Sequence, residues 1–242
     1  MPELDHAAIV GERTVGADRC QAPSQKCDKP PTVPERPMRH GCRPPTLDGM
    51  ARRIRIEIPG ASYHVTARGN DRQRIYFGNW SGRLFVRELD RAALRYGWRV
   101  FAYCLMTNHY HMVLQIGDRG LSHGMCELNG RFARATNWVN RRTDHVFGKR
   151  FYDRVVDTDE HWEEVCRYVM LNPVRSSAGC RDPRQWRWSS LRPTLGLEHP
   201  PACLDVGEVL GRFGGDPRRA RESLWRFLRE GMAPATAPGT GM

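Results

Sequence analysis

The stretch 102-AYCLMTNHYHMVLQ-115 decides how this chain folds and where its chemistry lies. It reads as extended apolar chain with the polar pair Thr107–Asn108 in the middle, which predicts two strands joined by a tight turn. His109 and His111 stand in the second strand, and residues at i and i+2 of a strand project from the same face. We therefore expect the two imidazoles side by side with converging nitrogen atoms, which is half of a metal site.

The stretch 157-DTDEHWEEVCRYVMLNP-173 predicts a helix packed on the core. Its apolar residues recur at i, i+3, i+4 and i+7; they are Trp162, Val165, Cys166 and Val169. Asp157 and Glu160 fit the two ends of a capping box at its start. Pro173 is expected to end the helix, because the residue before a proline is disfavoured in the α region.

The exposed side of this helix carries a polar column in which Glu164, Tyr168 and Asn172 follow one another at i+4 spacing. Residues four apart are neighbours on a helix surface, so the tyrosine and the asparagine can face one partner together. That partner is predicted to be the histidine pair. Glu164 is a possible auxiliary group that orients a ligand or accepts a proton, and a solvated helix carboxylate is the simpler interpretation.

Five motifs, taken together, resemble the single-tyrosine HUH transposases, and more closely their chromosomal relatives, the REP-associated tyrosine transposases. The two most informative are NHYH at 108–111 and YVMLNPVR at 168–175. The others occur in the family's order and are IPGASYHVTARGNDRQRIYF at 58–77, GKRFYDR at 148–154 and WRWSS at 186–190. The likeness covers roughly Met50–Gly196. Ordered motifs are far more specific than an isolated pair of histidines.

The resemblance implies metal-dependent cleavage and rejoining of single-stranded DNA at a palindromic hairpin. Tyr168 would be the nucleophile, forming a 5′-phosphotyrosine that conserves the energy of the phosphodiester bond and leaves a free 3′ hydroxyl. His109, His111 and the side-chain oxygen of Asn172 would hold Mg²⁺ or Mn²⁺, which helps a phenol with an ordinary pKa of about 10 to attack. Imidazole pairs also suit Zn²⁺, so the identity of the metal stays open.

Charge is consistent with a nucleic-acid partner. The formal net charge of +11 falls entirely on residues 50–242, because residues 1–49 hold seven basic and seven acidic side chains. Nearly all the basic residues are arginines, whose guanidinium groups bind phosphate in a bidentate manner. The candidate DNA-contacting residues are Arg68, Arg72, Arg131, Arg134, Arg150 and Arg154.

The order of elements predicts an α+β fold, ferredoxin-like βαββαβ with an antiparallel sheet and extra C-terminal helices. Strands are expected over 63–68, 98–106, 109–115 and 151–156, and helices over 81–96, 122–140, 157–172 and 216–229, the 81–96 helix being capped by Asn79 or Ser81. Residues 50–196 would form the catalytic domain and 197–242 a helical extension. Residues 1–49, rich in proline and without aromatic residues, are predicted to be a disordered tail or to precede the true start.

Cysteine usage and apolar patterning bound the remaining possibilities. The eight cysteines are scattered and form no CxxC motif, and no long apolar run or signal peptide is present. We therefore expect a reduced, cytoplasmic protein. The family resemblance further implies a bacterial, nucleoid-associated protein that is either a monomer or a homodimer. No membrane partner is expected.

Two other functions remain open at this stage. One is a domesticated, non-catalytic protein that binds hairpin DNA or RNA, and the other is an RNase that uses histidines as acid and base. Two local features are also open: His64 could reach the site or be a core histidine, and the tryptophans of WRWSS could stack on bases or pack a C-terminal strap onto the domain.

Overall fold

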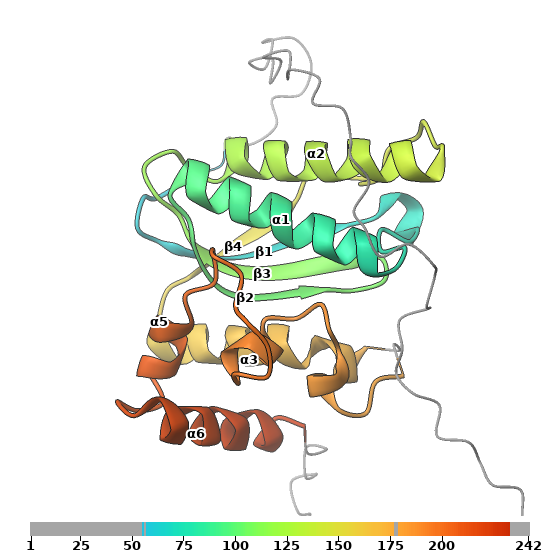
Figure 1. Ribbon diagram of the computed structural model, residues 1–242. Helices are drawn as coiled ribbons and strands as arrows, with labels where there is room; N and C mark the ends of the chain where they lie inside the picture. The colour runs from blue at the N-terminus through green and yellow to red at the C-terminus, as the bar shows by residue number, and fades with distance from the viewer. Residues whose placement is uncertain (1–54, 56, 177–178, 233–242) are drawn as a thin grey trace, which may run out of the picture.

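The computed structural model describes residues 55, 57–176 and 179–232 (Figure 1). The prediction for residues 1–49 lies outside the described residues. The first six elements are β1 (Ser62–Arg68), α1 (Asn79–Tyr96), β2 (Arg99–Leu105), β3 (His109–Gln115), α2 (Ser122–Asn140) and β4 (Tyr152–Val156). The strands form one antiparallel sheet in the order β2-β3-β1-β4. The predicted α+β class and ferredoxin-like arrangement are confirmed.

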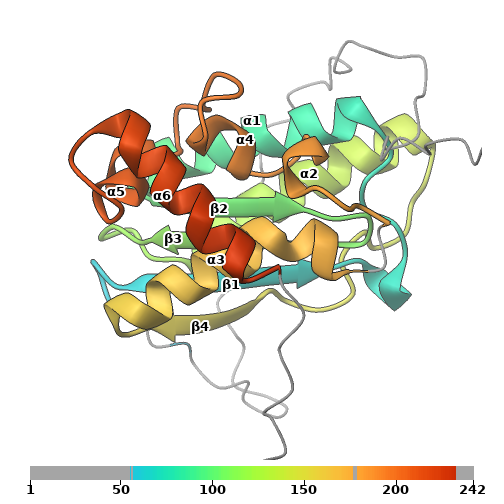
Figure 2. The ribbon, with the colours of Figure 1, turned by 90° about the horizontal axis from the view of Figure 1, so that it is seen from below.

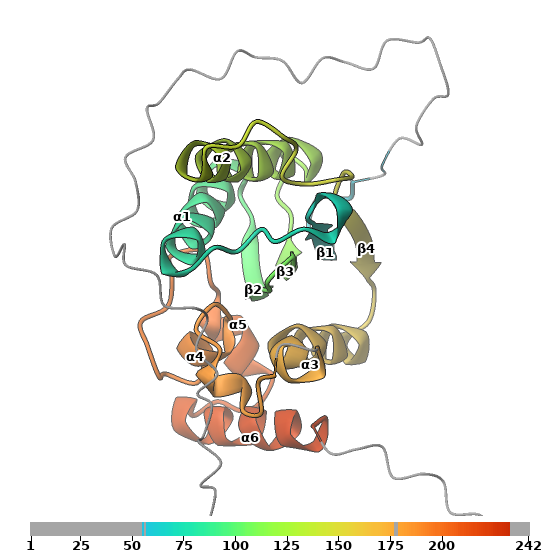
Figure 3. The same ribbon diagram turned by 90° about the vertical axis from the view of Figure 1, so that its right-hand side faces the viewer.

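The C-terminal part of the described chain is helical. It contains α3 (Asp159–Arg175), α4 (Leu191–Thr194), α5 (Val206–Gly211) and α6 (Pro217–Glu230). Two 3-10 turns are also present: η1 (Asn70–Arg72) follows β1, and η2 (Pro183–Gln185) follows α3. Helices α1 and α2 cover one face of the sheet, whereas α3 lies on the other face with α6 beyond it (Figures 1 and 3). Seen from below, α6 crosses over α3 (Figure 2). Helix α3 is therefore enclosed between the sheet and α6.

The alternation of side chains along β3 determines which face carries the histidines. Tyr110, Met112 and Leu114 pack into the core under α1 and α2, while Val113 belongs to the core shared with α3. Tyr110 also donates a hydrogen bond to Asn129 Oδ1 at 2.6 Å. The positions that alternate with them, including both histidines, face α3.

Two predicted helix starts are wrong by one or a few residues. The N-cap of α1 is Gly78 rather than Asn79 or Ser81, although Ser81 Oγ accepts a hydrogen bond from Phe77 N at 2.9 Å. The N-cap of α3 is Thr158, whose hydroxyl accepts from the backbone N–H three residues later. The preceding Asp157 instead binds the His161 ring, so it is not the residue that caps the helix.

Pro173 does not end α3, which continues to Arg175. A proline inside a helix removes the one hydrogen bond that its own nitrogen would have made. The following turn still closes, because Ser176 N donates to Asn172 O at 3.0 Å. Leu171, Asn172 and Pro173 are all buried, so packing outweighs the local preference of the residue before the proline.

The WRWSS motif packs a strap onto the sheet. Trp186 Nε1 donates to Leu105 O at 3.0 Å and Trp188 Nε1 donates to Tyr76 OH at 2.6 Å, and both tryptophans are buried. The strap also bridges Cys104 of β2 through Ser189 and so covers the outer edge of that strand. The packing interpretation is confirmed, and these rings are not available for base stacking.

The predicted C-terminal helix is confirmed as α6. Its N-cap is Asp216, whose carboxylate accepts from Arg219 N, and its buried side chains are Ala220, Leu224 and Leu228. In the described part of the chain, no helix has both the length and the apolar character needed to cross a membrane.

Candidate active site

The two histidines lie on β3, an inner strand of the sheet, as predicted. Antiparallel pairing with β1 places Thr66 opposite His111 and Arg68 opposite His109. The two imidazole rings are 5.0 Å apart between centroids and nearly perpendicular, at 87°. The expected side-by-side arrangement is therefore present, on a strand held from both sides.

Hydrogen bonds at Nδ1 orient the His109 ring. Asn108 Nδ2 donates to Arg72 O at 3.0 Å, so the amide oxygen of Asn108 is the atom that faces His109 Nδ1 at 2.8 Å. An amide oxygen only accepts, so we assign the proton to Nδ1 of His109. This leaves the lone pair on Nε2, the atom that a histidine ligand offers to a metal.

The His111 ring is held in a similar way by β1. Its Nδ1 lies 3.0 Å from Thr66 Oγ1 and 3.0 Å from His64 Nε2, and the His64 and His111 rings stack with centroids 5.2 Å apart. With Nδ1 occupied by these partners, Nε2 is again the nitrogen left for a ligand.

Both histidines are neutral near pH 7. Burial, helped by the Arg68 charge, lowers the pKa of His109 to about 4, and the Asn172 side chain opposes this shift. Burial, followed by repulsion from His109 and His64, lowers the pKa of His111 to about 3. Metal ligands must be deprotonated, so these rings are in the required state without paying for proton loss.

Helix α3 brings Tyr168 and Asn172 to the same place. The Tyr168 ring stands edge-on to His111, with centroids 5.4 Å apart and planes at 89°, and the side chain is 38% exposed. Asn172 is buried, and its Oδ1 makes no hydrogen bond of regular geometry among the described residues, although the side chain lies close enough to His109 to act on the pKa of that ring. A buried amide oxygen without a partner costs free energy, so it marks a place where a donor or a cation would be stabilised.

The donor atoms present fit a divalent cation. Two neutral imidazole nitrogens and the partnerless Asn172 oxygen would leave open coordination positions, which a catalytic ion needs for substrate. Within the described ranges, no three His, Cys, Asp or Glu side chains form a metal-binding group. A third ligand at the histidine pair would therefore have to be an amide oxygen such as that of Asn172.

Two predicted arginines lie far from this site and two lie beside it. Arg131 and Arg134 are on α2, across the sheet from α3, and Arg131 is paired with Glu127. By contrast, Arg68 ends β1 opposite His109, and Arg154 of β4 pairs with His64 in register.

The other predicted contacts are at the edges of the site. Arg72, in η1, and Arg150, just before β4, are exposed near the end of the sheet that carries His109. Glu164 is exposed and binds Arg167 in an ion pair, which matches the solvated-carboxylate interpretation.

His64 and Thr66 are the site residues that the sequence indicated only weakly or not at all. The His64 ring also stands edge-on to Tyr168, with centroids 6.0 Å apart, so it belongs to the site and not to a core. The alternation YHVTAR places both residues on one face of β1. Only the pairing of β1 with β3, a long-range feature, shows that this face is the one that carries the histidine pair.

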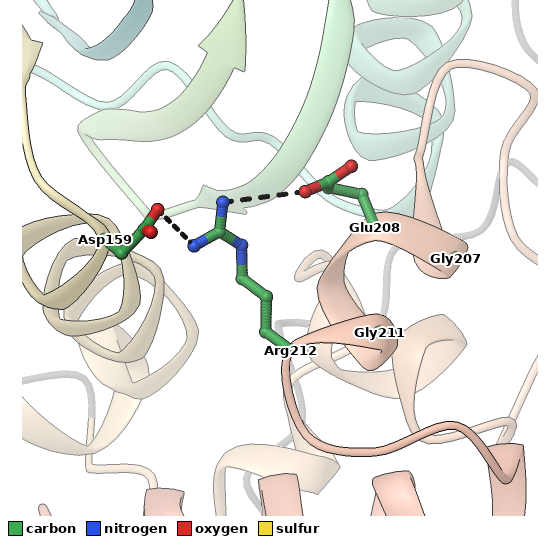
Figure 4. Close-up of a pocket in the computed structure, with 5 residues that line it drawn as sticks. All are labelled: Asp159, Gly207, Glu208, Gly211 and Arg212. Carbon is green, nitrogen blue, oxygen red and sulfur yellow. Dashed lines mark hydrogen bonds and ion pairs between the residues drawn. The ribbon is translucent and has the colours of Figure 1, made fainter.

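A surface pocket at the other end of α3 is separate from this site (Figure 4). In it Arg212 Nη1 binds Asp159 Oδ1 at 2.7 Å, and Arg212 Nη2 lies 3.6 Å from Glu208 Oε1. The same guanidinium lies over the Trp162 ring at 4.3 Å. These contacts anchor the start of α3 to α5 and so help to fix where Tyr168 is held.

The fold thus sets a histidine pair on the sheet opposite a tyrosine on a facing helix. The family model described as "Transposase IS200 like" matches residues 58–172, so this stretch of the chain is similar to that family. This confirms the resemblance carried by the motifs.

A solved structure agrees with this fold. It is described as the structure of a REP-associated tyrosine transposase bound to a REP hairpin, and it is similar to this chain with a TM-score of 0.52 and 17% identity. The match covers 65% of this chain and 93% of that one. A search of curated proteins finds no match.

Proposed function

We propose that this protein cleaves and rejoins single-stranded DNA at or beside a hairpin, through a covalent bond between DNA and Tyr168. The match of residues 58–172 to a transposase family model and the hairpin bound to the structural neighbour support the substrate class. The observation that carries the chemistry is the position of Tyr168, solvent-accessible and edge-on to His111, on the same helix face as the partnerless Asn172 oxygen.

In this proposal the Tyr168 oxygen attacks the phosphorus of a phosphodiester. The bond from phosphorus to the 3′ oxygen breaks, the phenol proton is lost, and the 3′ oxygen leaves as a hydroxyl. The product is a 5′-phosphotyrosine, and attack by a 3′ hydroxyl reverses the step and rejoins the strand.

His109 and His111, through Nε2, and Asn172, through Oδ1, would hold Mg²⁺ or Mn²⁺. When bound, such an ion polarises the phosphoryl oxygen and offsets the charge that develops during attack. The protein contributes orientation: Asn108, Thr66 and His64 hold the imidazole rings by their Nδ1 atoms.

Two arginines are placed to hold the phosphate beside Tyr168. Arg68 is exposed at the end of β1 opposite His109, and the Arg175 guanidinium lies 5.8 Å from the Tyr168 ring. Guanidinium groups bind phosphate oxygens in a bidentate manner, so they would orient the scissile phosphate toward the phenol.

The histidine pKa values argue against an RNase that relies on acid–base catalysis by histidine. An efficient general acid or base has a pKa near the working pH. Burial instead lowers the pKa of His109 to about 4 and that of His111 to about 3, so at pH 7 both rings are neutral and neither is the imidazolium that a general acid requires.

The test is the formation of a covalent protein–DNA adduct. A labelled pool of single-stranded hairpins with randomised flanks is incubated with the protein and Mn²⁺ and resolved on a denaturing gel. We expect an adduct with the wild type and with the matched control Tyr152→Phe, which changes a tyrosine that is 66% exposed on β4. The adduct should be absent in Tyr168→Phe and in EDTA.

Two outcomes would contradict the proposal. An adduct that persists in Tyr168→Phe would show that another residue is the nucleophile. Tight hairpin binding by the wild type without any adduct would instead support the non-catalytic binding protein, the alternative function.

A further inference from the structure

Trp138, in the last turn of α2, is a large aromatic side chain that the fold leaves 63% exposed. Single exposed apolar residues are common on protein surfaces and need no explanation by themselves. The surroundings of Trp138 are unusual because they are basic and because they reach the active site.

Trp138 leads directly into residues 139–150, which hydrogen bonds tie to residues 68–74. We call residues 68–74 and 138–150 the basic rim. It carries seven basic side chains and only two acidic ones, Asp71 and Asp144. The basic residues are Arg68, Arg72, Arg74, Arg141, Arg142, Lys149 and Arg150. All of them except the half-buried Arg142 are exposed.

Hydrogen bonds join the two segments of the rim into one surface. Asn70 N donates to Val146 O at 2.9 Å, and Gly148 N donates to Arg68 O at 3.4 Å. Arg142 Nη2 donates to Gln73 Oε1 at 2.8 Å. The end of α2 is thereby tied to the turn that follows β1, and the positive charges are held together.

The backbone of the rim is strained. Among the described non-glycine residues, positive φ angles occur at Asp71 (50°), Arg72 (56°) and Arg141 (51°), all within the rim. The left-handed region costs an L-residue about 1–2 kcal/mol, and such strain collects at functional segments. Glycine would adopt these angles at lower cost, so the side chains at these positions are candidates for a function.

The rim is continuous with the active site. Arg72 O accepts a hydrogen bond from Asn108 Nδ2, and the same Asn108 holds the His109 ring through Oδ1. Figure 3 looks onto this end of the molecule, where the end of α2, the turn η1 and α3 are all in view.

We propose that the basic rim is a second single-strand subsite, in which Arg141 and Arg142 hold phosphates and Trp138 stacks on an unpaired base of the strand that reaches Tyr168. The inference rests on the proposed function, since it takes DNA as the substrate. An indole among guanidinium groups is suited to a nucleotide, which offers both a π-face and an anion. A paired duplex presents no free base face, and a protein partner would need a larger apolar patch than one ring.

The test compares two probes of equal length that differ only in their bases: fluorescent oligothymidylate and a fluorescent abasic oligonucleotide. Binding is followed by anisotropy with the full chain carrying Tyr168→Phe, so that no covalent step occurs. Trp138→Ala should weaken binding of oligothymidylate by about 5- to 150-fold, the range expected for one stacked base, and leave the abasic probe unchanged. Trp138→Phe should retain most of the affinity.

Leu94→Ala is the matched control, because Leu94 is 89% exposed on α1 and outside the rim. It should bind both probes like the parent. Arg141→Gln should weaken both probes and lower the salt dependence of binding by about one phosphate contact.

If Trp138→Ala leaves both affinities unchanged, or weakens binding of both probes equally, stacking on a base is not the interaction lost and the subsite is overturned. The phosphotyrosine proposal would still stand. Binding of neither probe by the parent would overturn the subsite as well, while the adduct gel decides separately on the proposed function.

Discussion

Replacing Asn172 by leucine separates stability from metal binding. Asn172 Oδ1 is buried without a hydrogen-bond partner, and such a group costs about 1–3 kcal/mol. Leucine has the same number and branching of side-chain heavy atoms and no polar atom, but its methyl groups are bulkier and it loses the contact of the amide with His109. We therefore expect Asn172→Leu to raise the free energy of unfolding in EDTA by about 1–2 kcal/mol, which at about 2–4 °C per kcal/mol corresponds to roughly 2–8 °C in Tm.

The assay is thermal unfolding in EDTA and in Mn²⁺. A ligand present at a hundred times its Kd stabilises the folded state by about 2.7 kcal/mol, so the wild type should gain several degrees with Mn²⁺. Asn172→Leu should gain little, while Tyr168→Phe, which keeps all three donors, should respond like the wild type. A lower Tm in EDTA together with an intact response to Mn²⁺ would refute the reasoning, because Oδ1 would then be an ordinary structural group.

Three further predictions follow from the packing. His64→Ala should weaken Mn²⁺ binding by about 10- to 100-fold in calorimetry, because His64 helps to hold His111 Nδ1, and His64→Gln should recover part of the loss. Equal Mn²⁺ affinities in the wild type and both variants would show that His64 does not act on the site. Burial lowers the pKa of His64, His109 and His111 below 6.5, so the folded state keeps its full stability above that pH and loses stability as pH falls toward 4. The free energy of unfolding in urea should therefore be lower at pH 5 than at pH 7, by on the order of 1 kcal/mol per histidine after allowance for partial exposure, and a higher stability at pH 5 would contradict this. Gly82→Ala should lower stability by about 1–3 kcal/mol in thermal unfolding, because its Cβ would lie 2.2 Å from the Trp188 ring, whereas Gly211→Ala meets open space and should not destabilise.

Local periodicity explains why much of the site was predictable. The faces of His109 and His111 follow from the two-residue period of a strand, and the shared face of Tyr168 and Asn172 follows from the period of a helix. Both patterns depend only on residues that are close in the sequence, so they do not depend on how the rest of the chain packs. The predicted order of strands and helices, βαββαβ, then indicated the ferredoxin-like arrangement of the sheet.

The features that sequence reasoning missed depend on contacts between distant segments. Pro173 remains helical because the residues around it are buried against the sheet and the later helices. His64 reaches the site only because β1 pairs with β3, and the face on which Arg131 lies is determined by the packing of α2 against the sheet. Composition indicated that arginines bind phosphate, but it carries no information about the face on which each one lies.

Helix α3 carries both buried packing residues and Tyr168, the proposed nucleophile, and this determines how the phenol can move. Val169, Met170 and Leu171 are fully buried between the sheet and the C-terminal helices, whereas the adjacent Tyr168 is 38% exposed. Any shift of the whole helix would expose those three apolar side chains, at about 1.5–3 kcal/mol each. Rotation of the Tyr168 side chain costs far less, so we expect the phenol to reach a bound phosphate by side-chain motion over the facing histidines.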